Sequence, residues 1–485
     1  MPSNLVVRVK VSSPTLQEGF RAIAQELELP GEFSAEVTAA AEKAAAAVVL
    51  PELDRTDLPF VTIDPAGSMD LDQAVHIERA GDGFVVHYAI ADVAAFVTAG
   101  DPIDLEANRR GETLYGASSR IPLHPPALSE GAASLLPDQV CPSLLWTLAV
   151  DAEGSCTDVH VERALVRSTR RWSYVEAQAA LDDGTADDVL SLLKEVGLLR
   201  EAQETARGGI SLPLPEQEIE ESDGSLHLVF REQLPVEQWN AQISLLTGIG
   251  AASLMVGAKV GLLRTLPPAD PRDVERLRRV AKGLRIDWPA DLDYAGFIRS
   301  LDPSRSQHQA MVVACTRLLR GSGYAAFDGE LPEQTMHSAI AAEYAHVTAP
   351  LRRLGDRYAG EVCLAICAGE PVPDWVRAAL PGLPKTLQDS GRRAGSYQRA
   401  VLDLIEAALL ADRVGEQFEG VVTSVRDDEA TNGVLLIEEV GVEAPVTSAG
   451  PLPLGGEVTA TLASADLQAR KVSFTVASPA GTSGA

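Results

Sequence analysis

The spacing of hydrophobic residues changes twice along this chain of 485 residues, and this constrains the fold more than any other feature. β-branched and aromatic runs, such as residues 84–90 and 144–150, predict strands between residues 60 and 180. From about residue 170 to residue 414, apolar residues recur at helical spacing. Short strand-like runs return between residues 416 and 480. This order predicts an α+β protein whose mixed β-sheet core is wrapped by helices.

The same changes predict the domain borders. Residues 1–57 contain two stretches of helical spacing and are expected to form a small helical N-terminal domain, similar to a helix-turn-helix. Residues 58–414 form the main domain, which includes a C-terminal helical extension. Residues 415–480 carry about five short strands at regular spacing, which is typical of an OB-fold barrel. Residues 481–485 are expected to be a disordered tail.

The chain is strongly acidic, with 41 Lys and Arg against 69 Asp and Glu and a formal net charge of −28. Such a balance argues against a protein whose whole surface attracts nucleic acid, because polyanions bind basic surfaces. Net charge is an average, however, and a local basic channel can exist inside an acidic exterior. The composition therefore leaves nucleic acid open as a partner.

The five cysteines contain no CxxC pair and are expected to be free thiols, which fits a reducing compartment. No secretory signal is visible in the first ten residues, and no apolar run approaches the length of a membrane helix. We therefore expect a cytoplasmic protein that is not bound to a membrane.

Three aspartates form the first candidate site. Asp64 ends a predicted strand, and Asp70 and Asp72 are two residues apart, so that both carboxylates face one side of an extended chain. Carboxylate oxygens are ligands that suit Mg²⁺ or Mn²⁺. The pattern is weak when taken alone, because Asp-Leu-Asp recurs at Asp291 and Asp293 with no other candidate ligands around it.

A second candidate site lies near residue 350. Thr348 and Pro350 are expected to cap and begin a helix. Arg352 and Arg353 would then lie near a helix N-terminus, where the helix dipole and the guanidinium groups both favour an anion. The alternative is a solvated patch in which Asp356 neutralises one of the two arginines.

The third candidate is a proline-rich loop between residues 111 and 137. It contains an isolated tyrosine, Tyr115, and an isolated arginine, Arg120, which can offer a stacking ring and a phosphate contact. Composition alone indicates only an ordered loop.

Together and in this order, the three segments resemble the RNB catalytic domain of ribonuclease II and ribonuclease R. The family has an aspartate cluster of the form IDxxxxxDxDD, then a segment like YxxxxxIPMLPxxLS, and much later HFTSPIRRYxD. The corresponding segments here run over residues 63–73, 115–129 and 346–356, and residues 88–94 and 236–240 match further pieces. The resemblance covers roughly residues 58–414, with the small barrel where the family carries an RNA-binding OB-type domain.

The resemblance implies a processive 3′→5′ exoribonuclease that hydrolyses single-stranded RNA to nucleoside 5′-monophosphates. It implies that Asp64, Asp70 and Asp72 hold Mg²⁺, with Mn²⁺ as a substitute, and that Arg352 stabilises charge on the scissile phosphate. It assigns substrate contacts to Tyr115, Glu237, Leu212, Arg353 and His346. We further expect a monomer without an organic cofactor.

The sequence departs from the family pattern at two site positions. Gln73 stands where the family has its fourth aspartate, and it is expected to ligate the metal through its amide oxygen without adding charge. Leu212 stands where many members have a phenylalanine, which weakens stacking on the last bases.

Two larger segments also depart from the family. Residues 1–57 are too few for the two cold-shock barrels that members usually carry, so the chain resembles a short form. The region 416–480 contains three basic and ten acidic residues, and we expect this barrel to contribute packing more than affinity. The arginines at 276–279 are interpreted as a solvated helix face.

Two alternatives to an exoribonuclease stay open. In the first, the protein no longer binds the metal because Gln73 replaces a carboxylate ligand, and a catalytically weakened RNB fold binds RNA without cleaving it. In the second, the carboxylates serve another metal-dependent phosphoesterase that acts on nucleotides. The three retained aspartates, together with Arg352 and Tyr115, favour the ribonuclease.

Overall fold

The computed structural model describes residues 6–9, 14–116, 120–212, 216–222, 225–231, 233–302, 305–426, 429–437 and 442–476. The expected tail at residues 481–485 lies outside this set. Within it, the α+β content and the two strand-rich regions that the sequence predicts are confirmed.

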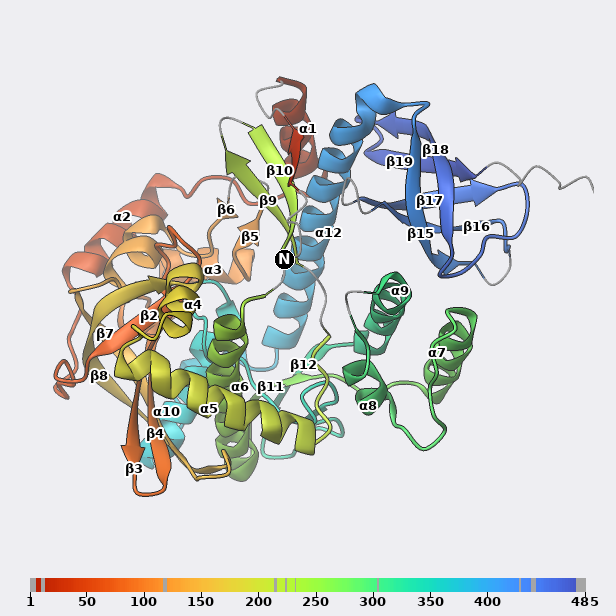
Figure 1. Cartoon of the computed structure of the whole chain (residues 1–485). Coiled ribbons are helices and arrows are strands. Elements are labelled where there is room, and N and C mark those ends of the chain that lie inside the picture. The colour runs from red at the N-terminus through yellow and green to blue at the C-terminus, as the bar shows by residue number, and fades with distance from the viewer. Residues whose placement is uncertain are drawn as a thin grey trace, which may run out of the picture.

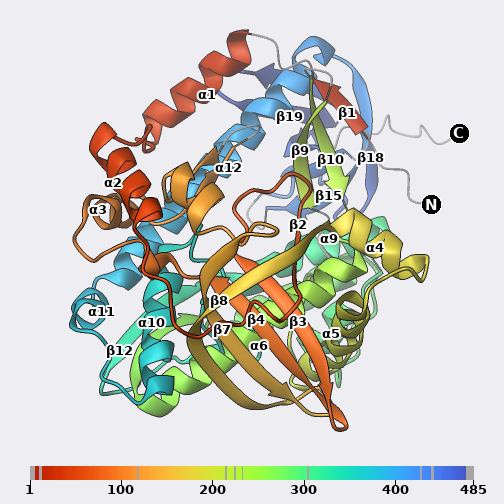
Figure 2. The same ribbon diagram turned by 90° about the vertical axis from the view of Figure 1, so that its left-hand side faces the viewer.

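The first strand-rich region is a closed five-stranded barrel in which neighbours follow the order β2-β3-β4-β7-β8. Its strands are β2 (Phe60–Asp64), β3 (Gln73–Ala80), β4 (Gly83–Ala91), β7 (Val140–Val150) and β8 (Cys156–Ser173). The barrel closes because β8 pairs in parallel with β2, whereas all other pairs are antiparallel. The expected mixed sheet is therefore wound on itself, and Tyr88 and Trp146 are fully buried in its core. Figure 2 shows β8, β7, β4 and β3 side by side.

Helices wrap this barrel, as expected. They are α3 (Pro102–Arg110), α4 (Tyr174–Asp182), α5 (Asp188–Ala206), α6 (Pro235–Ala258), α10 (Leu354–Ala368) and α11 (Asp374–Ala379), and the single helical turns η1 (Val93–Ala95) and η2 (Leu128–Ala132) lie in the connections. Of the helices that the structure describes, α6 alone is long and apolar enough to cross a membrane, by length and composition only. Half of its most apolar window is buried inside the protein, where it packs against α5, α10 and β11 (Val260–Thr265). This packing explains its apolar character.

A second group of helices lies beside the barrel, on the side towards the C-terminal domain (Figure 1). It consists of α7 (Pro271–Gly283), α8 (Tyr294–Arg299), α9 (Ser306–Cys315) and η3 (Thr316–Leu319), which share a small core of their own. The β11 strand connects this group to the main domain by pairing with β12 (Gly323–Asp328). Short strand pairs complete the region: β5 (Leu114–Tyr115) with β6 (Arg120–Ile121), and β13 (Met336–His337) with β14 (Ala342–Glu343).

The C-terminal region is a second closed five-stranded barrel, with strands β15 (Gln417–Val425), β16 (Asn432–Ile437), β17 (Val442–Ser448), β18 (Glu457–Asp466) and β19 (Lys471–Val476). Neighbours follow the order β15-β16-β17-β19-β18, and the predicted small barrel is confirmed. The long helix α12 (Leu383–Leu410), continued by η4 (Ala411–Arg413), runs from the first domain to this barrel (Figure 1) and packs against β12, β18 and β19.

The N-terminal region differs from the prediction. Two helices are present, α1 (Pro14–Glu26) and α2 (Ala35–Ala46), but a strand precedes them. This strand, β1 (Val6–Val9), forms a three-stranded sheet with the distant hairpin of β9 (Glu216–Ser222) and β10 (Ser225–Arg231). The two helices do not share a core: α1 packs against α12, and α2 packs against α3 and η2. The two predicted helices are therefore present, but each apolar face is buried against a different part of the main domain.

Candidate active site at one end of the first barrel

The three predicted aspartates come together where β2 ends. Asp64 is the last residue of β2, as expected, and Asp70 and Asp72 lie in the loop before β3. The strand β3 begins only at Gln73, so Asp70 and Asp72 lie outside it. Leu71 and Asp72 are both buried, whereas Asp70 is partly exposed.

A serine holds this loop in place. The Leu71 N–H donates to Ser134 Oγ at 2.9 Å, and the same hydroxyl donates to the Met69 carbonyl at 2.7 Å. The proline-rich segment therefore supports the aspartate loop through main-chain contacts. The two carboxylates on either side of Leu71 are thereby fixed at the barrel end.

Asp72 connects the aspartate loop to the segment near residue 350, which are the first and second candidate sites. The Leu351 N–H donates to Asp72 Oδ1 at 2.7 Å, and Arg352 Nε donates to Asp72 Oδ2 at 3.2 Å. Gln73 makes a parallel connection, because its Nε2 donates to the Thr348 carbonyl at 2.5 Å. Segments almost 280 residues apart thus meet at one carboxylate and one amide.

Burial and mutual repulsion change the acidity of this site. Burial raises the pKa of Asp64 to about 7, with a further contribution from the negative charge of Asp72 and an opposing one from Arg352. Burial also raises the pKa of Asp72 to about 7, against the opposing effect of Arg352 and of the Leu351 N–H. Burial therefore disfavours the charged form of both carboxylates, and a nearby cation would favour it.

Asp70 has a cationic partner of its own. Arg120 Nη1 lies 2.5 Å from Asp70 Oδ1, and Arg120 Nη2 lies 2.6 Å from Glu130 Oε1. Arg120 and Tyr115 are opposite each other in the β5–β6 pair. The sequence suggested Arg120 only as a phosphate contact, whereas the structure pairs it with two carboxylates.

Arg352 and Arg353, the arginines of the second candidate site, make different contacts. The helix after them, α10, begins at Leu354 and not at Pro350 as expected, because Asp356 accepts the Ala349 N–H at 2.8 Å and holds the preceding residues in a turn. Arg353 is paired with Asp356 at 2.7 Å, which is the neutralised arrangement that the alternative interpretation described. Arg352 keeps 44% of its side chain exposed while contacting Asp72, and it is the arginine that faces the site.

Tyr115 lies beside the same centre. Its side chain is 41% exposed. Its hydroxyl has a pKa raised to about 12, first by burial and then by the charges of Asp70 and Asp72, while Arg352 acts in the opposite direction. The ring is thus accessible beside carboxylates and a guanidinium, and its contact with a terminal nucleotide stays a prediction.

The other predicted substrate residues make different contacts. His346 Nδ1 is 2.8 Å from the Tyr324 hydroxyl, and burial holds the pKa of His346 well below its usual value, so the imidazole is neutral. Glu237 accepts the Leu234 N–H at 2.9 Å and caps the first turn of α6. Leu212 packs against the core of the α7–α9 group. Their substrate contacts stay predictions.

Two residues near the carboxylates were missed by the sequence analysis. Arg171 donates to the Ser68 carbonyl at 2.8 Å and lowers the pKa of Asp64. Tyr174 has a pKa raised to about 12 by burial and by the charge of Asp64. Both belong to or directly follow β8, the parallel partner of β2. Only the closure of the barrel brings them close, so no local signal could have identified them.

The carboxylates of Asp64, Asp70 and Asp72 have the chemistry that a divalent cation requires, but two of them are occupied by contacts with other groups. Among the residues that the structure describes, no three His, Cys, Asp or Glu side chains form a metal-binding group. The reason is visible, since Arg120 holds Asp70, and Arg352 with the Leu351 N–H holds both oxygens of Asp72. Two buried carboxylates with a raised pKa are nevertheless a site that gains from a bound cation.

Comparison with protein families gives two matches. The RNB domain matches residues 53–365, and the RNase II-type exonuclease C-terminal S1 domain matches residues 416–477. The first match contains the carboxylates, Tyr115 and Arg352, and the second coincides with the second barrel.

Among curated proteins, ribonuclease R of Escherichia coli is 28% identical over 483 residues, covering 88% of this chain and 57% of the relative. Ribonuclease R of Mycoplasma pneumoniae is 27% identical over 393 residues, covering 77% of this chain and 54% of the relative. This chain therefore spans a little more than half the length of these two relatives.

Among solved structures, Mycoplasma genitalium RNase R in complex with ribose-methylated single-stranded RNA superimposes with a TM-score of 0.85 at 20% identity, over 96% of this chain and 78% of that one. Yeast Ssd1, a pseudonuclease, superimposes with a TM-score of 0.71 at 14% identity, over 90% of this chain and 56% of that one. The fold is thus shared by a ribonuclease and a pseudonuclease, and the argument about activity has to come from the site.

Proposed function

Because this chain belongs to the RNB family, whose domain matches residues 53–365, we propose that it is a processive 3′→5′ exoribonuclease that degrades single-stranded RNA to nucleoside 5′-monophosphates. The observation that carries the proposal is the contact of Asp72 with Arg352. It places a guanidinium, which binds phosphate, against a cluster of carboxylates, which bind a metal ion.

Each side chain has a task in this proposal. Asp64 and Asp72 would hold Mg²⁺ or Mn²⁺, and Asp70 would join them on release from Arg120. The chemistry that such a cation supplies when bound is stabilisation of charge on the phosphate and activation of water. Arg352 binds a non-bridging oxygen of the scissile phosphate, and Asp72 orients its guanidinium. Tyr115 contacts the terminal nucleotide with its exposed ring.

Gln73 has a structural task that weakens the case for a binding-only protein. Its amide N–H donates to the Thr348 carbonyl and links β3 to the turn that carries Arg352. An aspartate could not make this bond, since a carboxylate is only an acceptor. The glutamine therefore supports the arrangement of Asp72 and Arg352, and its presence is no sign that the site has decayed.

We also propose that the enzyme acts as a monomer in the cytoplasm. All five cysteines are free, which suits a reducing compartment.

A substrate panel tests the proposed function. Purified protein is incubated with a single-stranded RNA, the single-stranded DNA of the same sequence, or mononucleotides, with Mg²⁺ or with EDTA, and the products are separated by chromatography. We expect nucleoside 5′-monophosphates from the RNA with Mg²⁺ and none from the DNA, because the 2′-hydroxyl distinguishes the two. Equal degradation of DNA would favour a general phosphoesterase. Binding of intact RNA without products would favour the binding-only alternative.

A further inference from the structure

The three residues that follow α3, residues 111–113, hold the main chain of Arg352. The Thr113 N–H donates to the Arg352 carbonyl at 3.0 Å, and the Leu354 N–H donates to the Gly111 carbonyl at 3.0 Å. The two segments therefore pair like antiparallel strands, with their middle residues opposite each other. We call residues 111–113 the connecting segment, because the chain continues from it into β5. The position of the Arg352 main chain thus depends on what holds the connecting segment.

The connecting segment also lies against the long helix α12. A Cβ on Gly111 would be 2.4 Å from the Ser390 Cβ, and Gly111 has a φ of +78°, so this close approach requires a glycine. Arg393 of α12 donates from Nη2 to the carbonyl of Arg109 at 3.2 Å and to that of Arg110 at 2.7 Å. These carbonyls belong to the last turn of α3, where an α-helix leaves carbonyls without a helical partner. α12 thus fixes the end of α3 and the start of the connecting segment.

Glu112, the middle residue of the connecting segment, places its side chain against α12. Its carboxylate is hydrogen-bonded to Ser390, and a Cβ on Gly391 would lie 3.7 Å from Glu112 Oε1. Burial raises the pKa of Glu112, whereas the hydrogen bond with Ser390 and three guanidinium groups favour the charged form. These guanidinium groups come from the turn before α10, from β11 and from α12, and they belong to Arg353, Arg264 and Arg393. One carboxylate therefore faces positive groups from three elements that surround the connecting segment.

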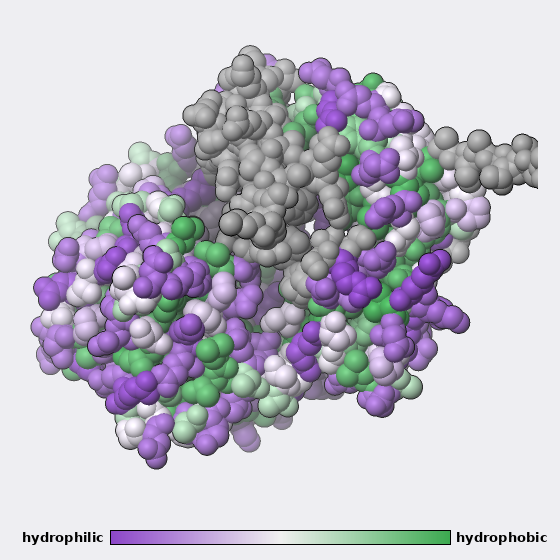
Figure 3. Space-filling model, in the orientation of Figure 1, coloured by the Kyte–Doolittle hydropathy of each residue, from purple (hydrophilic) through white to green (hydrophobic). Residues whose placement is uncertain are grey.

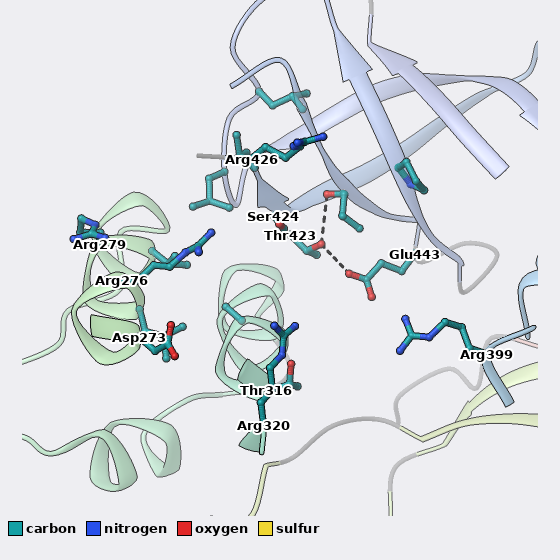
Figure 4. A pocket seen from close by; sticks show the side chains of 18 residues that line it. Asp273, Arg276, Arg279, Thr316, Arg320, Arg399, Thr423, Ser424, Arg426 and Glu443 are labelled. Atoms are coloured by element: carbon teal, nitrogen blue, oxygen red, sulfur yellow. Dashed lines mark hydrogen bonds between the residues drawn. The ribbon is translucent and has the colours of Figure 1, made fainter. Parts of the chain in front are cut away.

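The contacts of α12 at this point differ from those of its next arginine. Hydrophilic side chains gather where the α7–α9 group meets the second barrel (Figure 3). Arg399 of α12 lines a pocket of about 720 Å³ at that place, between α7 and the barrel (Figure 4). The described lining of this pocket includes neither Ser390 nor Arg393. The contact between α12 and the connecting segment is thus separate from the pocket, and a substitution at Glu112 leaves the lining of the pocket unchanged.

We propose that Glu112 is a positioning residue for Arg352. Its carboxylate fixes the connecting segment to α12, and the connecting segment fixes the main chain from which the Arg352 guanidinium reaches Asp72. The Arg352 side chain is partly exposed, so its direction depends on a firmly held main chain. Misplacement of a catalytic group by about 1 Å can cost about 100-fold in rate. The proposal rests on the proposed function and adds to it a residue that acts through Arg352.

The test is a double-mutant cycle that asks whether Glu112 acts through Arg352. kcat and KM for a single-stranded RNA tetranucleotide are measured with Mg²⁺ for the unsubstituted protein, Glu112→Ala, Arg352→Ala and the protein with both substitutions. Asp389→Ala is the control, because Asp389 is a partly exposed carboxylate next to Ser390 that pairs with basic residues of its own helix. Thermal melting identifies a temperature at which all proteins are folded. If Glu112→Ala does not fold, Ser390→Ala takes its place, since it removes the same hydrogen bond from the side of α12.

We expect Glu112→Ala to lower kcat about tenfold and to change KM by less than about twofold, because Arg352 acts mainly in the transition state. In the Arg352→Ala background, the same substitution should have no further effect on kcat. A residue that only stabilised the fold would lower the rate by the same factor in both backgrounds. Asp389→Ala should keep the kcat of the unsubstituted protein. Equal losses in the two backgrounds, or an unchanged kcat in Glu112→Ala, would overturn the proposal.

Chemical modification separates this proposal from the proposed function, because it does not depend on cleavage. Phenylglyoxal, which modifies arginine side chains, is added to the unsubstituted protein and to Glu112→Ala, and mass spectrometry of peptides gives the rate at each arginine. We expect Arg352 to react at least about threefold faster in Glu112→Ala, since its guanidinium loses the contact with Asp72. Arg377, which pairs with Asp328, should react at the same rate in both proteins. If the unsubstituted protein degrades no RNA, the proposed function fails, and these rates still decide on Glu112. If RNA is degraded normally and neither kcat nor the rate at Arg352 changes in Glu112→Ala, the positioning proposal fails alone.

Discussion

The two barrels of this protein are alike in construction and different in what surrounds them. Both are closed, have five strands and contain buried apolar residues, such as Trp146 in the first and Phe474 in the second. The first barrel brings three aspartates to the end of β2, where Arg352 reaches them from a distant turn. The second brings Thr423, Arg426 and Glu443 to its surface, where helices of the other domain add four arginines.

The difference shows that the barrel fold does not decide the function of either region. In the first barrel, burial raises the pKa of Asp64 and Asp72, so that their charged forms gain from a nearby cation. Beside the second barrel, a pocket is lined by five arginines and two carboxylates. The following predictions test this division, from the largest expected effect to the smallest.

Asp72→Asn is expected to lower the rate of RNA hydrolysis by at least about 100-fold, because it removes a charge that contacts Arg352 and that, in the proposed function, would hold the metal. Asp291→Asn is the matched control, since Asp291 lies in the same Asp-Leu-Asp pattern but on the exposed surface before α8. It should leave the rate unchanged. An equal loss of hydrolysis rate in both variants would contradict the assignment of the active site to the end of the first barrel.

Arg352 and Arg353 are neighbours in sequence, but replacing them should affect different properties: the catalytic rate for Arg352 and the stability of the fold for Arg353. Arg352→Ala is expected to lower kcat by about 100-fold and to reduce thermal stability less than Arg353→Ala does, because the Arg352 side chain is partly exposed and lies farther from its carboxylate partner. Arg353→Ala should destabilise the fold by about 3–5 kcal/mol, because it leaves Asp356 buried without its partner. Steady-state kinetics and thermal melting of both variants check this. Similar melting temperatures for the two variants would contradict it.

The stability of the metal-free protein should depend on pH through Asp72. Its pKa in the folded state is about 7, above the unfolded value of 3.8, so the folded state binds a proton more tightly. The stability contributed by this group is therefore lost as pH rises from about 4 to about 7. In EDTA, Asp72→Asn should match the unsubstituted protein at about pH 4 and melt a few degrees higher at about pH 8. A difference that is the same at both pH values would contradict the raised pKa.

The ion pair of Arg120 with Asp70 should compete with metal binding. Arg120→Gln is expected to increase affinity for Mn²⁺ by about fivefold, which corresponds to loss of a partly exposed pair worth about 1 kcal/mol. Titration followed by electron paramagnetic resonance measures free Mn²⁺ directly. Arg55→Gln is a suitable control, because Arg55 pairs with Asp57, outside the group of Asp64, Asp70 and Asp72. Unchanged or weaker Mn²⁺ binding in the Arg120 variant would show that the arginine does not occupy a metal position.

Much of this arrangement could be predicted from the sequence, because several of its determinants are local. The strand that ends at Asp64 and the short strands of the second barrel both follow from periodicity. Motif order identified the family and placed Asp72 and Arg352 in one site. Those residues then came together in the structure.

The features that could not be predicted depend on contacts between distant segments. The closure of β8 on β2 brings Arg171 and Tyr174 to Asp64, and no spacing in the sequence indicates it. The start of α10 is shifted by a bond from the Ala349 N–H to Asp356. The lining of the basic pocket combines residues of α7, α12 and the barrel, and no local pattern in the sequence indicates that they meet.

The most direct test of the central claim is a time course on a single-stranded RNA labelled at its 5′ end, with Mg²⁺, for the unsubstituted protein, Asp72→Asn and Asp291→Asn. We predict that the unsubstituted protein and Asp291→Asn convert the RNA to short labelled oligomers, while Asp72→Asn leaves it intact. Immediate release of a labelled mononucleotide would show attack from the 5′ end. Unchanged cleavage by Asp72→Asn would show that the carboxylates at the end of the first barrel are not the catalytic centre.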